Sequence, residues 1–194
     1  MVGQGFIPDP LRGILRSGKG ALNAKTIKKN QSAFVRCPSG TKAIAVCFPQ
    51  PIMPTHAVTT VTHQRRALFQ RTVNAELLQQ LLFRYRDQGR YQLHGFVIMP
   101  DHVHLLLTPS PTQTLALCIK CIKGGFSYAV RAKFGGEIWQ PSFHEHRIRD
   151  TEDFQNQLHY IAANPQRRGL PNHPFVHTAF PSRIDPMPAE FRSR

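Results

Sequence analysis

The stretch from Tyr91 to Pro109 constrains the fold of this chain more than any other. It reads YQLHGFVIMPDHVHLLLTP, in which two largely apolar runs flank the pair Pro100-Asp101. Such runs predict β-strands, and a Pro-Asp pair between them predicts a turn. We therefore expect two strands that form a hairpin and pack into the core of the protein.

Strand and helix patterns alternate on either side of this hairpin. In chain order we expect a strand at 56–65, a helix at 74–89, the hairpin, a helix at 114–134, a strand at 142–149 and a helix at 150–165. The first six elements follow the order of the split βαβ, ferredoxin-like arrangement, an antiparallel sheet with two helices on one face. The predicted fold is therefore α+β, with the last helix as an addition at the C-terminal end.

Polar residues, glycines and a proline mark the expected limits of the helices. Asn74 is predicted to be the N-cap of the first helix. The paired glycines at 124–125 are expected to weaken or kink the second. Asp150 or Thr151 can cap the third helix, which Pro165 is expected to end.

The chain divides into a basic arm and one domain. Residues 1–52 contain eight Lys or Arg and a single acid, Asp9, with no sustained periodicity, so we expect a disordered N-terminal arm. An alternative is that the natural start is Met53. Residues 53–194 are predicted to form a single domain, whose tail from about Pro171 is rich in loops.

The charge of the chain points to a polyanionic partner. Lys and Arg number 25 against 11 Asp and Glu, a net charge of +14. Nucleic acid is the commonest partner of such a surface, and a ribosomal partner or an anionic membrane surface is the alternative. No apolar run approaches the ~20 residues of a membrane span. Four cysteines form no dense disulfide framework, and no signal peptide is visible, so we expect a cytoplasmic protein.

Two histidines interrupt the second strand of the hairpin. Residues i and i+2 of a strand point to the same face, ~6.6 Å apart, so His102 and His104 project together while Val103 faces the core. Paired imidazoles are typical of metal sites, although two polar residues on a solvated sheet face would look the same. His144 and His146 have the same spacing, but the residue between them is charged, so we rank them lower.

A tyrosine on the third helix has a metal-binding residue one turn away. Of the four tyrosines, only Tyr160 has at position i+4 a residue, Asn164, whose oxygen can bind a hard cation. The alternative is a core tyrosine followed by an asparagine that caps the helix.

Three sequence blocks together resemble a known family. The blocks MPDHVHLLL, IWQPSFHEHRIRD and LHYIAANPQRRGL are similar to those of the single-tyrosine HUH transposases, in particular the REP-associated tyrosine transposases of the IS200/IS605-like superfamily. The resemblance covers about residues 56–180. It implies that Tyr160 is the catalytic nucleophile and that His102, His104 and Asn164 bind the metal. His144 departs from the family pattern, because an aromatic residue is common there.

The resemblance implies a metal-dependent single-stranded DNA endonuclease and strand transferase. It would act on hairpin DNA through a 5′-phosphotyrosine intermediate, with one Mg²⁺ or Mn²⁺ ion as cofactor. A catalytically silent regulator that binds hairpin DNA is the alternative. A replication initiator that uses the same chemistry would usually carry extra domains. Monomers and dimers both occur among such enzymes, and we expect a monomer here.

Basic and ionisable residues near the three blocks are candidates for supporting roles. The residues expected to contact DNA phosphates are Arg147, Arg149, Arg167 and Arg168. A tyrosine is mostly protonated at neutral pH, so its oxygen needs a nearby base or the metal. Three residues could activate the tyrosine oxygen: His146, His159 and Lys123. The sequence gives no reason to prefer one of them.

Overall fold

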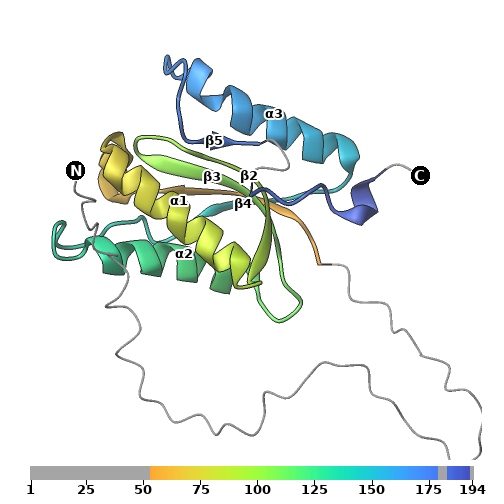
Figure 1. The fold of residues 1–194 in the computed structure, drawn as a ribbon, viewed down its shortest axis with the longest axis horizontal. Coiled ribbons are helices and arrows are strands. Elements are labelled where there is room, and N and C mark those ends of the chain that lie inside the picture. Colours follow the sequence, from red (N-terminus) through yellow and green to blue (C-terminus); the bar gives the residue numbers. More distant parts are fainter. Residues whose placement is uncertain (1–52, 179–182, 193–194) are drawn as a thin grey trace, which may run out of the picture. The chain divides into compact units, whose positions relative to one another are not determined.

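A five-stranded antiparallel sheet with the strand order β4-β1-β3-β2-β5 forms the middle layer (Figure 1). The computed structural model describes residues 53–178 and 183–192, so the arm predicted at 1–52 lies outside the described residues. The strands are β1 (His56–Val61), β2 (Tyr91–Ile98), β3 (His102–Pro109), β4 (His144–Arg147) and β5 (Val176–His177). The predicted hairpin is confirmed as β2 and β3, and β3 is the central strand.

Helices cover both faces of this sheet (Figure 1). The helices α1 (Thr72–Asp87) and α2 (Leu115–Val130) pack on one face, and α3 (Thr151–Arg167) packs on the other. The order β4-β1-β3-β2 is that of the predicted ferredoxin-like α+β fold, and α3 is the predicted addition. In the described part of the chain, no helix has both the length and the apolar character needed to pass through a bilayer.

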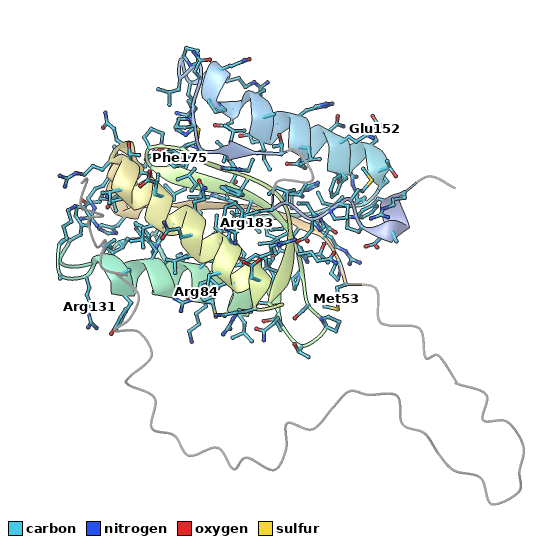
Figure 2. All side chains as sticks on the ribbon, in the orientation of Figure 1. Met53, Arg84, Arg131, Glu152, Phe175 and Arg183 are labelled. Atoms are coloured by element: carbon cyan, nitrogen blue, oxygen red, sulfur yellow. The ribbon has the colours of Figure 1, made fainter. Side chains whose placement is uncertain are left out.

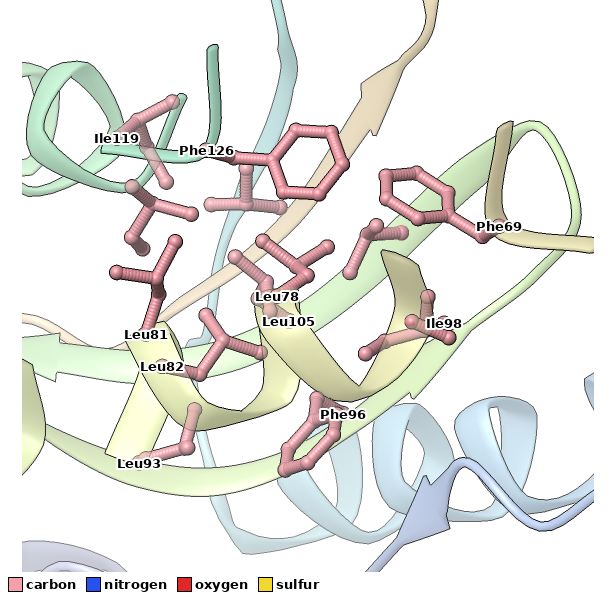
Figure 3. Packing of buried hydrophobic residues seen from close by; sticks show 14 of the residues in the cluster. Phe69, Leu78, Leu81, Leu82, Leu93, Phe96, Ile98, Leu105, Ile119 and Phe126 are labelled. Carbon is pink, nitrogen blue, oxygen red and sulfur yellow. The ribbon is translucent and has the colours of Figure 1, made fainter. Parts of the chain in front are cut away.

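The alternation of side chains along β3 divides the interior into two cores. Val103, Leu105 and Leu107 belong to the larger core beneath α1 and α2. Figure 3 shows Leu105 there among residues such as Leu78 and Phe126. Leu106 belongs instead to the smaller core beneath α3. The period of two therefore places His102 and His104 together on the face opposite to Val103, as predicted, and this is the face that α3 covers.

The start of α3 agrees with the capping prediction. The Asp150 carboxylate accepts a hydrogen bond from the Asp153 backbone N–H at 2.8 Å, which satisfies one of the free donors of the first turn. Glu152, labelled in Figure 2, and Asp153 add negative charge where the helix dipole favours it. Pro165 was predicted to end the helix, but α3 continues to Arg167. A proline in the last turn removes only one backbone hydrogen bond, so the turn can close around it.

The start of α1 differs from the prediction. Asn74 is not the N-cap, because the helix begins at Thr72. Its side chain is buried and donates a hydrogen bond to the Leu68 carbonyl at 2.7 Å. Asn74 therefore satisfies a carbonyl of the preceding short 3₁₀ turn (Leu68–Gln70), a partner that no local pattern identifies.

Two further boundaries depend on tertiary structure. β1 ends at Val61 instead of Arg65, because Gln64 and Arg65 both adopt a φ of 52° and turn the chain. The tail after Pro171 is not all loop, because the two residues of β5 pair with β2.

Asp185 attaches a later part of the tail to β2 and α1. Its carboxylate accepts hydrogen bonds from the Leu93 N–H at 2.7 Å and from the Arg86 guanidinium at 2.6 Å.

The paired glycines do not kink α2, which is a continuous helix from Leu115 to Val130. Gly125 instead lies directly against the Tyr85 side chain of α1, so that a Cβ at this position would collide with the phenol. A Cβ at Gly124 would meet no atom within 4 Å. The glycine at position 125 thus permits the close approach of the two helices.

We predict opposite effects of alanine at these two positions. Gly125→Ala should lower the free energy of unfolding by about 1–3 kcal/mol, because it overpacks the contact with Tyr85. Gly124→Ala should raise it by about 0.5–1 kcal/mol, because alanine is the better helix former and has free space there. Urea unfolding of both variants measures this, and equal effects of the two substitutions would contradict the packing role of Gly125.

Candidate metal and tyrosine site

The two histidines of β3 form the floor of the candidate site. Both are buried, and their ring centroids lie 4.9 Å apart at an interplanar angle of 85°. The shared face of His102 and His104, predicted from their spacing, is therefore observed. Their position on the central strand means that sheet hydrogen bonds on both sides hold the backbone that carries them.

Asn164 of α3 reaches the same place from above the sheet. Its Nδ2 lies 3.1 Å from His104 Nε2, and the residue is 5% exposed. Its Oδ1 is buried without a hydrogen-bond partner, which is costly for an amide oxygen unless another group binds it.

These residues fit a divalent ion. The Asn164 amide, whose nitrogen lies 3.1 Å from His104 Nε2, is directly beside the imidazole with which its oxygen would share an ion. The unpartnered Oδ1 supplies the oxygen that Mg²⁺ or Mn²⁺ prefers, and the imidazoles also suit Mn²⁺. Within 53–178 and 183–192, no three His, Cys, Asp or Glu side chains converge on a metal site, so an amide ligand is needed to complete this set.

Two further side chains orient the histidine rings. Thr59 on β1 is the cross-strand neighbour of His104, and its Oγ1 lies 2.7 Å from His104 Nδ1. Asp101 Oδ1 lies 2.5 Å from His102 Nδ1, and Arg65 pairs with the other carboxylate oxygen at 3.1 Å. With both Nδ1 atoms engaged, the Nε2 atoms are the ones that could face a metal, and His104 Nε2 here contacts the Asn164 amide nitrogen.

Sequence reasoning missed both orienting residues. Asp101 stands directly before His102, but it was assigned only to the hairpin turn. Thr59 carries no local signal, because its role depends on the register between β1 and β3.

The environment of His104 keeps its imidazole neutral. Burial lowers the pKa of His104 to about 4, and the neighbouring His102 and Arg168 act in the same direction. A neutral ring has a nitrogen lone pair available at neutral pH, which a metal ligand requires.

Tyr160 lies at the open side of this group. It is 40% exposed, and its ring centroid is 5.2 Å from that of His104 at an angle of 83°. Tyr160 and Asn164 are one helical turn apart, so both face the histidines from α3. The buried side chains of His102, His104 and Asn164 and the accessible phenol thus meet at one edge of the interface between α3 and the sheet.

The three candidates for activating the tyrosine lie in different places. His146 on β4 pairs with Asp153 at 2.8 Å, and it lines the same small hollow as Tyr160. His159 is exposed on α3 and is absent from that lining. Lys123 belongs to α2, on the other face of the sheet, where its Nζ donates to the Gln140 carbonyl at 2.5 Å.

The four predicted arginines surround α3 unevenly. The Arg167 guanidinium lies 5.8 Å from the Tyr160 ring centroid, and Arg168 is near enough to lower the pKa of His104. Arg149 lies 3.6 Å from Asp153, and Arg147 is exposed on the edge strand β4. The structure therefore brings Arg167 and Arg168 to the site and leaves the other two at the start of α3 and on the sheet edge.

The known proteins that this chain resembles are transposases. Residues 53–164 match the family described as "Transposase IS200 like". A REP-associated tyrosine transposase of Escherichia coli is 29% identical over 99 residues, which is 50% of this chain and 58% of the relative. The ISDra2 transposase TnpA of Deinococcus radiodurans is 30% identical over 77 residues, or 36% of this chain and 55% of the relative. The chain thus spans little more than half the length of these curated relatives.

A solved structure extends the similarity to the fold. It is a REP-associated tyrosine transposase bound to a REP hairpin, with a TM-score of 0.56 and 27% sequence identity. The alignment covers 64% of this chain and 77% of that one.

We predict that Thr59 tunes metal affinity through His104. Thr59→Val keeps the shape of the side chain but removes the partner of His104 Nδ1, so Mn²⁺ affinity should fall about 10–100-fold. Thr60→Val is the matched control, because Thr60 Oγ1 is buried without a hydrogen-bond partner. Calorimetric titration with Mn²⁺ compares the two variants. Unchanged affinity in Thr59→Val, or an equal loss in Thr60→Val, would contradict the orienting role.

Proposed function

Because the chain belongs to the IS200-like transposase family, we propose that it is a metal-dependent endonuclease and strand transferase that acts on single-stranded hairpin DNA. The observation that carries the proposal is the meeting of an exposed phenol, Tyr160, with a buried set of two imidazoles and an unpartnered amide oxygen. The unpartnered Asn164 oxygen is buried beside His104, where an ion held by the histidines would bind it.

In the proposed reaction the Tyr160 oxygen attacks the scissile phosphorus. The tyrosine–phosphorus bond forms as the bond to the 3′ oxygen breaks, which yields a 5′-phosphotyrosine and a free 3′-OH. Attack by another 3′-OH reverses the step and joins two strands without ATP. The position of Tyr160 on α3, with its ring centroid 5.2 Å from that of His104, keeps the nucleophile close to the proposed ion.

His102, His104 and Asn164 would hold the divalent ion. When bound there, Mg²⁺ or Mn²⁺ would supply Lewis-acid polarisation of the phosphate. Thr59 and Asp101 keep the two rings oriented for this role.

The phenol proton needs an acceptor when the tyrosine attacks. Among the three candidates only His146 lines the hollow beside Tyr160, which favours it over His159 and Lys123. Its Nε2 lies 2.8 Å from Asp153, a contact that holds the ring in place.

The proposed substrate is a DNA hairpin with a single-stranded flank. A similar protein of known structure is bound to a REP hairpin. The net charge of +14 suits a phosphate backbone, and Arg167 and Arg168 are placed to contact it near the nucleophile. We propose that the protein acts as a monomer in the cytoplasm, with the chemistry confined to residues 53–194.

We predict a covalent adduct between the protein and its DNA. Labelled hairpin DNA incubated with Mn²⁺ or Mg²⁺ should give a shifted band on a denaturing gel, which disappears with chelator and in Tyr160→Phe. Tyr128→Phe is the matched control, because Tyr128 is similarly exposed, at 38%, but lies on α2. Tight binding without an adduct in either metal would favour the silent hairpin-binding regulator. An adduct that survives Tyr160→Phe would assign the nucleophile to another residue.

A further inference from the structure

A small hollow lies beside Tyr160, and the proposed reaction places no DNA group in it. It has a volume of about 130 Å³ and lies between α3 and the strands β1 and β4. The side chains that bound it around the tyrosine are those of Ala57, Thr59, His104, His144, His146, Gln157 and Ile161. It therefore opens directly from the candidate active site.

The register of the sheet explains why the hollow exists. Ala57 lies on β1. Its neighbour on β3 is Leu106, and its neighbour on β4 is His146. The short alanine side chain leaves a depression between two longer ones. The next row contains His104, Thr59 and His144, so His144 lies on the same face as the metal-binding histidine, two strands away.

The walls of the hollow suit a flat, neutral ring with polar edges. Tyr160, His104 and His144 contribute aromatic rings, and Gln157 offers an amide that can both donate and accept hydrogen bonds. None of the described residues that line it is Lys or Arg, and the Glu145 side chain pairs with His56 on the opposite face of the sheet. A phosphate would therefore be poorly held here, whereas the arginines near Tyr160 lie outside the lining.

The volume of the hollow and the charges around it limit which chemical groups could bind there. The volume is well below the ~300–1,000 Å³ of pockets for whole small-molecule ligands, so one ring system fits better than a nucleotide. The Asp153 carboxylate nearby is already engaged by His146 and by the Arg149 N–H, at 2.8 and 3.1 Å. Little unpaired negative charge thus remains to repel a DNA strand from this side.

We propose that the hollow binds one unpaired nucleobase of the DNA strand that Tyr160 cleaves. The base stacks against His144 and is read at its edge by Gln157, so these residues determine which nucleotide lies beside the scissile phosphate. Proteins commonly hold unstacked bases in this way, by aromatic stacking and edge contacts. The inference rests on the proposed function but adds a specificity site to it.

The test uses the full-length protein and hairpin DNA with a single-stranded flank. The fluorescent base 2-aminopurine is placed at each flank position in turn, and its fluorescence reports insertion of that base without the need for cleavage. We expect quenching at one position in the wild-type protein, and loss of that quenching in Ala57→Leu, which fills the hollow, and in Gln157→Ala. Affinity for the flanked hairpin should fall about tenfold in both variants, within the ~5–150-fold range for one stacked base. Affinity for the hairpin without its flank should be unchanged.

Gln155→Ala is the matched control, because Gln155 is exposed on the same helix and does not line the hollow. It should behave as wild type. If no flank position is quenched, or if quenching persists in both Gln157→Ala and Ala57→Leu, the base-binding site is wrong even where an adduct still forms. Quenching that follows the predicted pattern in a protein that forms no adduct would support the base site and contradict the proposed cleavage.

Discussion

The site depends on the period-two alternation of one strand buried on both faces. β3 lies in the middle of the sheet, and all eight of its residues are buried. Its odd-numbered residues Val103, Leu105 and Leu107 pack beneath α1 and α2, and burial of each contributes ~1.5–3 kcal/mol relative to exposure to water. The same packing holds His102 and His104 on the other face.

Packing in the smaller core sets the position of α3, and therefore where Tyr160 and Asn164 lie relative to those histidines. Phe154 and Ile161 of α3 pack with Leu106 and Ile148, and this contact fixes how the helix lies across the sheet. Tyr160 and Asn164 follow at helical spacing, one at the exposed edge and one in the interior. The amide oxygen of Asn164 is left without a partner by this arrangement, and a metal ion would stabilise it.

Local chemistry was sufficient to predict much of this arrangement. Hydrophobic runs, the turn and the Asp150 cap gave the element order, and the spacing of the histidines gave their shared face. Features that depend on contacts between distant segments were missed or wrong, such as the buried role of Asn74, the pairing of β5 and the orienting role of Thr59. The continuation of α3 past Pro165 was missed because a proline near a helix end costs little.

The central claim is that the two histidines of β3 and the asparagine of α3 bind one metal ion. Pulsed electron paramagnetic resonance of the Mn²⁺-loaded protein tests it directly, because it detects nitrogen nuclei bound to the ion. Our account predicts couplings from two imidazole nitrogens, reduced to one in His102→Ala. Bound Mn²⁺ without nitrogen couplings, or with couplings that are the same in the variant, would contradict it.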